Sequence, residues 1–153
     1  MNVNFKLLPE AAVTTRLATK QAVLEQAAQV FAQVYGLDAS AALEGLQERE
    51  RLGSTGFGRG VAIPHARAAG INRPIVVLLQ LETPVDFDAA DGMPVDLVFA
   101  MLSPENAGAT HLHALAAISR LVRDDAMHEA LSQAPDAEAL YAQLSNRLYQ
   151  DAA

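Results

Sequence analysis

The sequence predicts an α/β fold in which a single sheet is flanked by helices. Two short apolar runs, 75–81 and 95–101, have the length and composition of strands buried on both faces. Segments with helical spacing of apolar residues lie before and after these runs. Because no helical segment separates the two runs, strict alternation of strand and helix is excluded, and some strand pairs are expected to be antiparallel.

Two helices are expected in the first third of the chain. Thr19 is suited to cap the first, which ends at Gly36. Asp38 or Ser40 can cap the second, which carries Arg49 in its last turn next to a glycine-rich segment. The apolar residues expected to face inward are Val23, Ala27, Val30, Phe31 and Val34 in the first helix, and Leu43 and Leu46 in the second.

The middle of the chain is expected to supply the strands. Residues 61–64 read as a short strand, and the apolar run from residue 75 is expected to end at Thr83-Pro84. Asp91-Gly92 is a turn signal before the second apolar run, which Ser103-Pro104 is expected to end.

The last third of the chain is expected to be helical. A third helix is predicted from Thr110 to Arg123, followed by two shorter helices over 126–134 and 137–149. The C-terminal residues 151–153 are expected to be frayed. The apolar residues of the third helix are Leu112, Leu115, Ile118, Leu121 and Val122.

Length and composition favour one compact domain over residues 1–153. The chain has no cysteine, which excludes disulfides and thiolate metal sites, and we expect a cytoplasmic protein. It shows no signal-peptide pattern, and its apolar runs are far shorter than the roughly 20 residues that cross a bilayer. The net charge of −7 argues against a wide nucleic-acid interface, and neither nucleic-acid binding nor membrane insertion is expected.

Positive charge gathers in one window of this acidic chain. Residues 49–73 contain five arginines and a single acid, Glu50, so the window carries +4 while the rest of the chain carries −11. Four glycines stand within residues 53–60 and can turn backbone N–H groups toward a ligand. Guanidinium groups match phosphate geometry, so the window is expected to bind an anion.

His65 closes this glycine-rich segment, directly after Pro64. A lone histidine is usually structural, but a neutral imidazole among arginines and backbone N–H groups can accept a phosphoryl group as a nucleophile. The arginines and N–H groups would stabilise the phosphoryl oxygens during transfer. The hydroxyls of Ser54 and Thr55 could contact phosphate, although the same residues also make a good turn.

The chain contains three other histidines. His111 and His113 are two residues apart on the expected third helix and therefore point about 200° apart, so they cannot share a metal ion. His111 lies in the first turn, where a helix N-terminus favours an anion. His128 is interpreted as a surface residue, and no metal or other cofactor is expected.

Other ligand classes have less support. The chain has no Walker motif, and its Gly-x-Gly-x-Gly pattern at 56–60 lacks the dinucleotide-binding spacing. An acidic cluster lacks the spacing of a calcium-binding EF-hand loop and is better explained as a solvated hairpin. The cluster consists of Asp86, Asp88, Asp91 and Asp96.

Two other functions remain alternatives to phosphoryl transfer. One is a non-covalent anion-binding module, and the other is a metal-assisted hydrolase that uses His65 and His111.

Five motifs of the chain are informative together: Arg49-Glu-Arg-Leu-Gly-Ser-Thr-Gly56, Gly60-Val-Ala-Ile-Pro-His65, Gln80-Leu-Glu-Thr-Pro84, Pro94-Val-Asp-Leu-Val-Phe-Ala100 and Thr110-His-Leu112. They resemble those of the type-2 enzyme IIA domains of the bacterial phosphoenolpyruvate-dependent phosphotransferase system, the fructose/mannitol class. The resemblance extends over essentially the whole chain, and within the family it is greatest to the free-standing nitrogen-regulatory IIA proteins.

The resemblance implies a mixed sheet with helices on both faces and a phosphohistidine relay. A histidine phosphocarrier of the HPr type would donate a phosphoryl group to His65, with family precedent favouring Nε2. The resemblance implies that Arg49 and His111 flank His65 as catalytic residues. Phosphate binding is expected from Ser54, Thr55, Gly56 and Arg67. Ala66 departs from the family, whose members often have glycine after the histidine.

The subtype within this family determines what the phosphorylated protein would do. A nitrogen-regulatory member would be a phosphotransferase component that acts by binding target proteins according to its phosphorylation state; potassium transport proteins and sensor kinases are the expected targets. A sugar-transport member would instead pass the phosphoryl group to a IIB domain of a permease. The motif similarity favours regulation.

Overall fold

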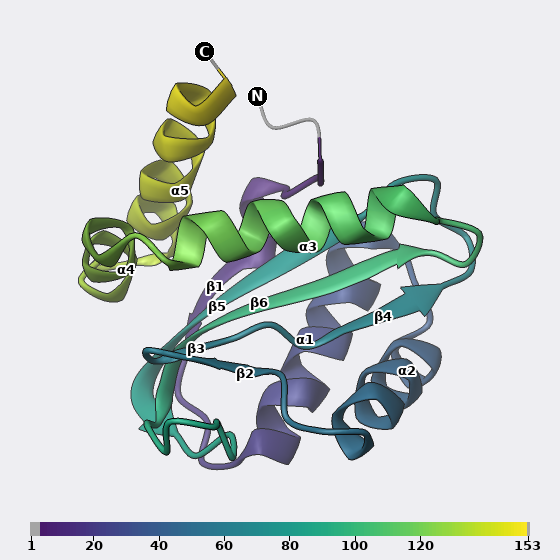
Figure 1. Cartoon of the computed structure of the whole chain (residues 1–153), viewed down its shortest axis with the longest axis horizontal. Coiled ribbons are helices and arrows are strands. Elements are labelled where there is room, and N and C mark those ends of the chain that lie inside the picture. The colour runs from purple at the N-terminus through teal and green to yellow at the C-terminus, as the bar shows by residue number, and fades with distance from the viewer. Residues whose placement is uncertain (1–3, 153) are drawn as a thin grey trace.

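The computed structural model describes residues 4–152, with side chains described as far as residue 148, and arranges helices around one six-stranded sheet (Figure 1). The helices are α1 (Lys20–Tyr35), α2 (Ala39–Arg51), α3 (Ala109–Val122), α4 (Asp125–Ser132) and α5 (Ala137–Ala152), with a 3-10 turn η1 (Pro9–Ala11) before the first strand. The strands are β1 (Ala12–Thr15), β2 (Gly56–Gly58), β3 (Val61–Ala62), β4 (His65–Ala68), β5 (Ile75–Val85) and β6 (Val95–Pro104).

The helix ends follow the capping signals in the sequence. The Thr19 side chain accepts from the N–H of Ala22 at the start of α1, and Gly36 ends that helix with a φ of 75°. Asp38 caps α2. The third helix begins at Ala109, one residue before the predicted start, and the predicted helix over 126–134 is α4, which starts at Asp125 and ends at Ser132.

The predicted frayed tail lies at the end of α5. The helical backbone continues to Ala152, whereas residue 153 and the side chains beyond residue 148 lie outside the described part of the chain. None of the helices in that part combines the length and the apolar character that a membrane crossing needs.

The sheet is mixed, as expected. Its strand order is β1-β5-β6-β3-β2, and β4 also pairs with β6. The central pair β5 and β6 is antiparallel, whereas β1 runs parallel to β5 and both β3 and β4 run parallel to β6. The strands β3 and β4 therefore follow one another along the same edge of β6.

Two strand boundaries differ from the prediction. Strand β5 does not end at Thr83-Pro84 but continues to Val85, because its pairing with β6 is interrupted between Gln80 and Val85 and the proline need not donate a ladder hydrogen bond. The strand predicted over 61–64 ends at Ala62, and after Pro64 the chain resumes as β4, so His65 begins a strand instead of following one.

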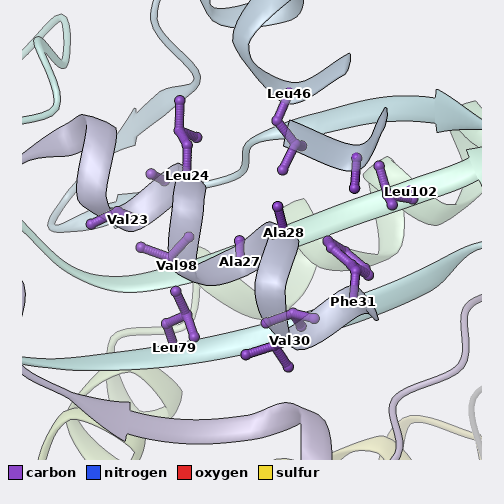
Figure 2. Packing of buried hydrophobic residues seen from close by; sticks show 14 of the residues in the cluster. Val23, Leu24, Ala27, Ala28, Val30, Phe31, Leu46, Leu79, Val98 and Leu102 are labelled. Atoms are coloured by element: carbon purple, nitrogen blue, oxygen red, sulfur yellow. The ribbon is translucent and has the colours of Figure 1, made fainter. Parts of the chain in front are cut away.

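The two faces of the sheet bury separate apolar clusters. Ile75, Val77 and Leu79 of β5 face α1 and α2, whereas Val76 and Leu78 face α3, α4 and α5. Figure 2 shows the first cluster, with side chains of α1 and Leu46 of α2 packed over the sheet. The labelled side chains of α1 in that view are Val23, Leu24, Ala27, Ala28, Val30 and Phe31. Helices thus cover both faces of the sheet, which confirms the predicted fold class.

Gln80 attaches the end of α4 to the sheet. It is a buried amide in the central strand β5, and its Nε2 donates to the carbonyls of Leu131, Ser132 and Ala134 at 2.8, 3.1 and 2.9 Å. Its Oε1 accepts from the hydroxyl of Thr14 at 2.8 Å. A polar residue in this buried position is therefore explained by the carbonyls that end α4.

Replacing Gln80 by leucine should destabilise the fold. Leucine keeps the volume but removes the amide that donates to the carbonyls of Leu131, Ser132 and Ala134, so we expect the free energy of unfolding to fall by about 1–3 kcal/mol. Chemical denaturation measures this, with Gln143→Leu on the exposed face of α5 as the control. Equal losses in the two variants, or a loss within about 0.5 kcal/mol of zero for Gln80→Leu, would contradict this account.

Candidate functional site

The edge of the sheet places His65 on the face that α3 covers. His65 is paired with Met101 of β6, and Met101 belongs to the apolar cluster beneath α3. Paired residues of neighbouring strands project to the same side of a sheet. The imidazole, which is partly buried, therefore points toward α3.

One ring nitrogen of His65 has a fixed role. Its Nδ1 lies 2.7 Å from the carbonyl oxygen of Ile63. A carbonyl can only accept, so Nδ1 carries the hydrogen of the neutral ring and Nε2 carries the lone pair. The tautomer that this contact selects has its nucleophilic nitrogen at Nε2.

The surroundings of His65 favour its neutral form. Burial is the largest cause that lowers its pKa below the ordinary value of 6.5, and the positive charge of Arg49 lowers it further. The hydrogen bond to Ile63 and the negative charge of Glu50 act in the opposite direction but do not cancel the decrease. Near neutral pH the ring is therefore unprotonated and able to act as a nucleophile.

His111 lies beside His65, whereas His113 does not. The two rings of His65 and His111 have centroids 5.8 Å apart and are tilted by 55°. His111 is buried in the first turn of α3, and His113 is exposed. His111 therefore lies next to His65, and His113 lies on the exposed face of α3.

Ser103 holds the ring of His111, and sequence reasoning missed this residue. The serine hydroxyl, which is fully buried in β6, lies 2.7 Å from Nδ1 of His111. This contact leaves Nε2 of His111 as the nitrogen that can face a ligand. Burial lowers the pKa of His111, and the charges of Arg67 and His65 lower it further.

Two arginines reach this pair of histidines from different elements. Arg49, in the last turn of α2, donates from Nη1 to the carbonyl of Gly53 at 2.9 Å, and its charge acts on His65. Arg67, in β4, donates to the carbonyl of Ala107 just before α3, and its charge acts on His111. The site therefore holds two cations next to two neutral imidazoles.

The start of α3 adds backbone donors. Its N-cap is Gly108, and no side chain caps the helix. Unpaired N–H groups at a helix N-terminus attract anions through their partial positive charge. Together with the two arginines, the first turn of α3 makes this region suited to an anionic group.

The loop at 53–56 is held by contacts within the chain. The hydroxyl of Ser54 donates to the carbonyl of Phe87 and accepts from the N–H of Gly56 at 2.9 Å. Thr55 is buried and is bonded through its N–H and hydroxyl to the carboxylate of Glu50. Both hydroxyls thus fix the loop, and phosphate binding by Ser54, Thr55 and Gly56 stays a prediction.

Two close approaches explain small residues near the site. A Cβ at Gly56 would lie 2.7 Å from the Cβ of Ala89 and 2.9 Å from its Cα, so only glycine fits there. A Cβ at Gly45 would lie 3.2 Å from the Cβ of Ala66. The methyl group of Ala66 is therefore accommodated by a glycine in α2.

His128 is not the simple surface residue that the sequence suggested. It is partly buried, and its Nε2 lies 2.9 Å from Oδ1 of Asp96, whose Oδ2 accepts from the hydroxyl of Ser132 at 2.8 Å. Asp91, from the same acidic cluster, instead accepts from the N–H groups of Arg59 and Met93 near the turn. Within the described residues, no group of three or more acidic or histidine side chains is arranged to hold a metal ion.

Comparison with known proteins identifies the family. Residues 6–147 match the family model described as "Phosphoenolpyruvate-dependent sugar phosphotransferase system, EIIA 2". The chain is 48% identical over 124 residues to a nitrogen regulatory protein of Pseudomonas aeruginosa, covering 80% of each chain. It is 40% identical over 146 residues to a nitrogen regulatory protein of Bradyrhizobium diazoefficiens, covering 95% of each.

Solved structures show the same architecture. The crystal structure of nitrogen regulatory protein IIA-Ntr from Neisseria meningitidis matches with a TM-score of 0.81 and 35% identity, covering 90% of this chain and 95% of that one. The mannitol IIA of Escherichia coli shares the fold, with a TM-score of 0.76 and 20% identity over 92% of this chain and 99% of that one. The chain therefore belongs to the type-2 EIIA family of the phosphoenolpyruvate-dependent phosphotransferase system.

Proposed function

We propose that the protein is a phosphohistidine carrier that accepts a phosphoryl group on Nε2 of His65 from an HPr-like phosphocarrier. The observation that carries this proposal is the contact between Nδ1 of His65 and the carbonyl of Ile63, because it directs the lone pair to Nε2. The lowered pKa of His65 and the nearby arginines support the same role.

The transfer step is a nucleophilic displacement at phosphorus. The lone pair on Nε2 of His65 attacks the phosphorus of the donor's phosphohistidine, so a nitrogen–phosphorus bond forms as the donor's bond breaks. The donor imidazole leaves with the bonding electron pair and takes a proton from solvent. Arg49, Nε2 of His111 and the N–H groups at the start of α3 would stabilise the phosphoryl oxygens during this step. His111 takes part as a donor when the Ser103 hydroxyl donates to its Nδ1, because the ring hydrogen is then on Nε2.

Exposed apolar side chains beside the site support docking of a protein donor. Leu52, which follows α2, is 84% exposed, and Leu112, adjacent to His111 in α3, is 65% exposed. Large exposed apolar residues next to a reactive group are typical of a protein contact surface. Transfer from a small-molecule phosphate donor would not require these two exposed apolar side chains.

We further propose that the carrier is regulatory and acts in the cytoplasm through state-dependent binding. The similar proteins of Pseudomonas aeruginosa and Bradyrhizobium diazoefficiens are named nitrogen regulatory proteins. A phosphoryl group adds about −1.5 to −2 charge, which would remove roughly half of the +4 carried by residues 49–73. Docking surfaces on potassium transport proteins or sensor kinases could distinguish these two states by their charge.

The first prediction from this proposal is that His65→Ala abolishes labelling. Incubation with a phosphorylated HPr-type carrier should increase the mass of the wild type by about 80 Da, the mass of one phosphoryl group, and the adduct should be acid-labile. The alanine variant should gain no mass, whereas His113→Ala, which alters the exposed histidine of α3, should label like the wild type. Labelling of His65→Ala at the wild-type rate would remove His65 from the mechanism, and no labelling of the wild type would favour the non-covalent anion-binding module.

A second prediction concerns Arg49. Arg49→Ala should slow phosphoryl transfer by roughly 100-fold, the order expected when one donor to developing negative charge is lost. It should also raise the pKa of His65, because Arg49 lowers it in the wild type. Since only the neutral ring attacks, the wild-type rate should decline only below pH 6.5, and this decline should move to higher pH in the variant.

Stopped-flow transfer rates across pH, with an NMR titration of His65, test both effects. Arg51→Ala is the matched control, because this arginine lies in the same turn but pairs with Glu48 on the surface. Wild-type rates in Arg49→Ala would show that Arg49 is only a charge at a helix end.

A third prediction tests regulation against sugar transport. The purified cytoplasmic domains of a potassium transporter and a sensor kinase from the same organism should bind the bare and phosphorylated forms with affinities that differ at least about tenfold. His65→Ala should behave as the bare form before and after incubation with the donor. Equal affinities, together with rapid transfer of the label to a fructose-type or mannitol-type IIB domain, would instead support the sugar-transport function.

A further inference from the structure

Glu50 is a buried carboxylate next to a residue of the proposed mechanism. It follows Arg49 in the last turn of α2, and its side chain is only 6% exposed. It is also the single acid among the residues 49–73 that give the chain its basic window. A buried carboxylate is costly unless its oxygens are paired, so its partners define what it does.

The partners of Glu50 are a loop residue and a lysine. The N–H of Thr55 donates to both carboxylate oxygens at 3.2 Å, and the hydroxyl of Thr55 donates to one of them. Nζ of Lys20, in the first turn of α1, lies 2.8 Å from the other oxygen. The carboxylate thus joins the end of α2, the start of α1 and the loop at 53–56.

The lysine is itself held in place. Its Nζ lies 5.0 Å from the centroid of the Phe87 ring and 4.0 Å from a carboxylate oxygen of Asp88. The backbone carbonyl of the same phenylalanine accepts from the hydroxyl of Ser54. Two successive loop residues are therefore held from both sides, Ser54 by the segment after β5 and Thr55 by Glu50.

The loop in turn orients Arg49. Nη1 of Arg49 donates to the carbonyl of Gly53 at 2.9 Å, two residues before Thr55. The arginine side chain is long and flexible, so a fixed acceptor is needed to hold its planar guanidinium group in one direction. Because Gly53 and Thr55 belong to the same short loop, we expect the contacts that hold Thr55 to restrain the Gly53 carbonyl as well, together with its backbone N–H, which donates to the carbonyl of Glu50 at 3.1 Å.

We propose that Glu50, with Lys20 as its counter-ion, is a positioning residue for phosphoryl transfer, which fixes the loop at 53–56 so that Arg49 is directed at the phosphoryl group on His65. This inference rests on the proposed function of His65. Glu50 itself does not touch the reacting atoms; it acts through Thr55, Gly53 and Arg49. Buried ion pairs often add little net stability compared with apolar residues, so a geometric role explains this pair better than a stabilising one.

The decisive experiment is a double-mutant cycle between Glu50 and Arg49. Single-turnover transfer from the phosphorylated carrier is measured for the wild type, Glu50→Gln, Arg49→Lys and the double variant. Glutamine keeps the shape of the side chain but loses the charge that pairs with Lys20. We expect Glu50→Gln to lower the maximal transfer rate about tenfold with an unchanged half-saturating carrier concentration, and to cause less than about a twofold further loss when Arg49 is already lysine.

Two controls separate positioning from folding. Glu48→Gln, on the exposed face of the same helix, should transfer at the wild-type rate. Lys20→Met should reproduce the slow transfer, whereas Lys20→Arg, which keeps the charge, should restore most of the rate. If Glu50→Gln fails to fold, Lys20→Met and Lys20→Arg are each measured in the wild type and in Arg49→Lys. These variants give the same double-mutant cycle through the counter-ion of Glu50.

The outcomes are distinct. Wild-type transfer by Glu50→Gln, or an equal loss with and without Arg49, overturns the positioning role while leaving His65 as the acceptor. A loss confined to carrier affinity also overturns it. Failure of the wild type to accept a phosphoryl group overturns the proposed function instead, and is seen before any variant is compared.

Discussion

The register of β4 against β6 is the constraint on which the site depends. Side chains alternate between the faces of a strand, so His65 and Arg67 of β4 project to the same side as Met101 and Ser103, their partners in β6. Ser103 contacts His111, which therefore meets His65 on this face. A slip of β4 by one residue would turn His65 and Arg67 toward α2 and would put Ala66 beneath α3.

Pro64 separates the two halves of this edge without ending the pairing. The proline has no N–H to donate, yet its carbonyl accepts from the N–H of Met101 at 2.9 Å, so β4 resumes in parallel with the same strand. The break also leaves the carbonyl of Ile63 available to the ring of His65. Local irregularity in the strand thus supplies the acceptor that selects the tautomer of the imidazole.

The sequence allowed much of the fold to be predicted where the signal is local. Caps at Thr19 and Asp38 mark helix starts through contacts within three residues, and the apolar runs identify the central strands. The short strands β1, β2 and β4 could not be predicted, because three or four residues carry too little periodicity to recognise.

The family motifs predict that His65, His111 and Arg49 lie in one site. In the structure the rings of His65 and His111 are neighbours, and the charge of Arg49 acts on His65. The partners of these residues could not be predicted. Glu50 forms an ion pair with Lys20, thirty residues away in the sequence, and His111 of α3 contacts Ser103 of β6. Neither pair has a periodic or compositional signature in the sequence.

Gln80 has a consequence for how the molecule opens. An isolated helix of eight residues is too short to persist in water, and α4 would be expected to fray on its own. Its last carbonyls are bonded to an amide in the central strand, and Asp96 of β6 binds its histidine and serine side chains. We therefore expect amide exchange in α4 to be coupled to the opening of the sheet, so that this eight-residue helix and the eleven-residue strand β5 belong to one cooperative unit.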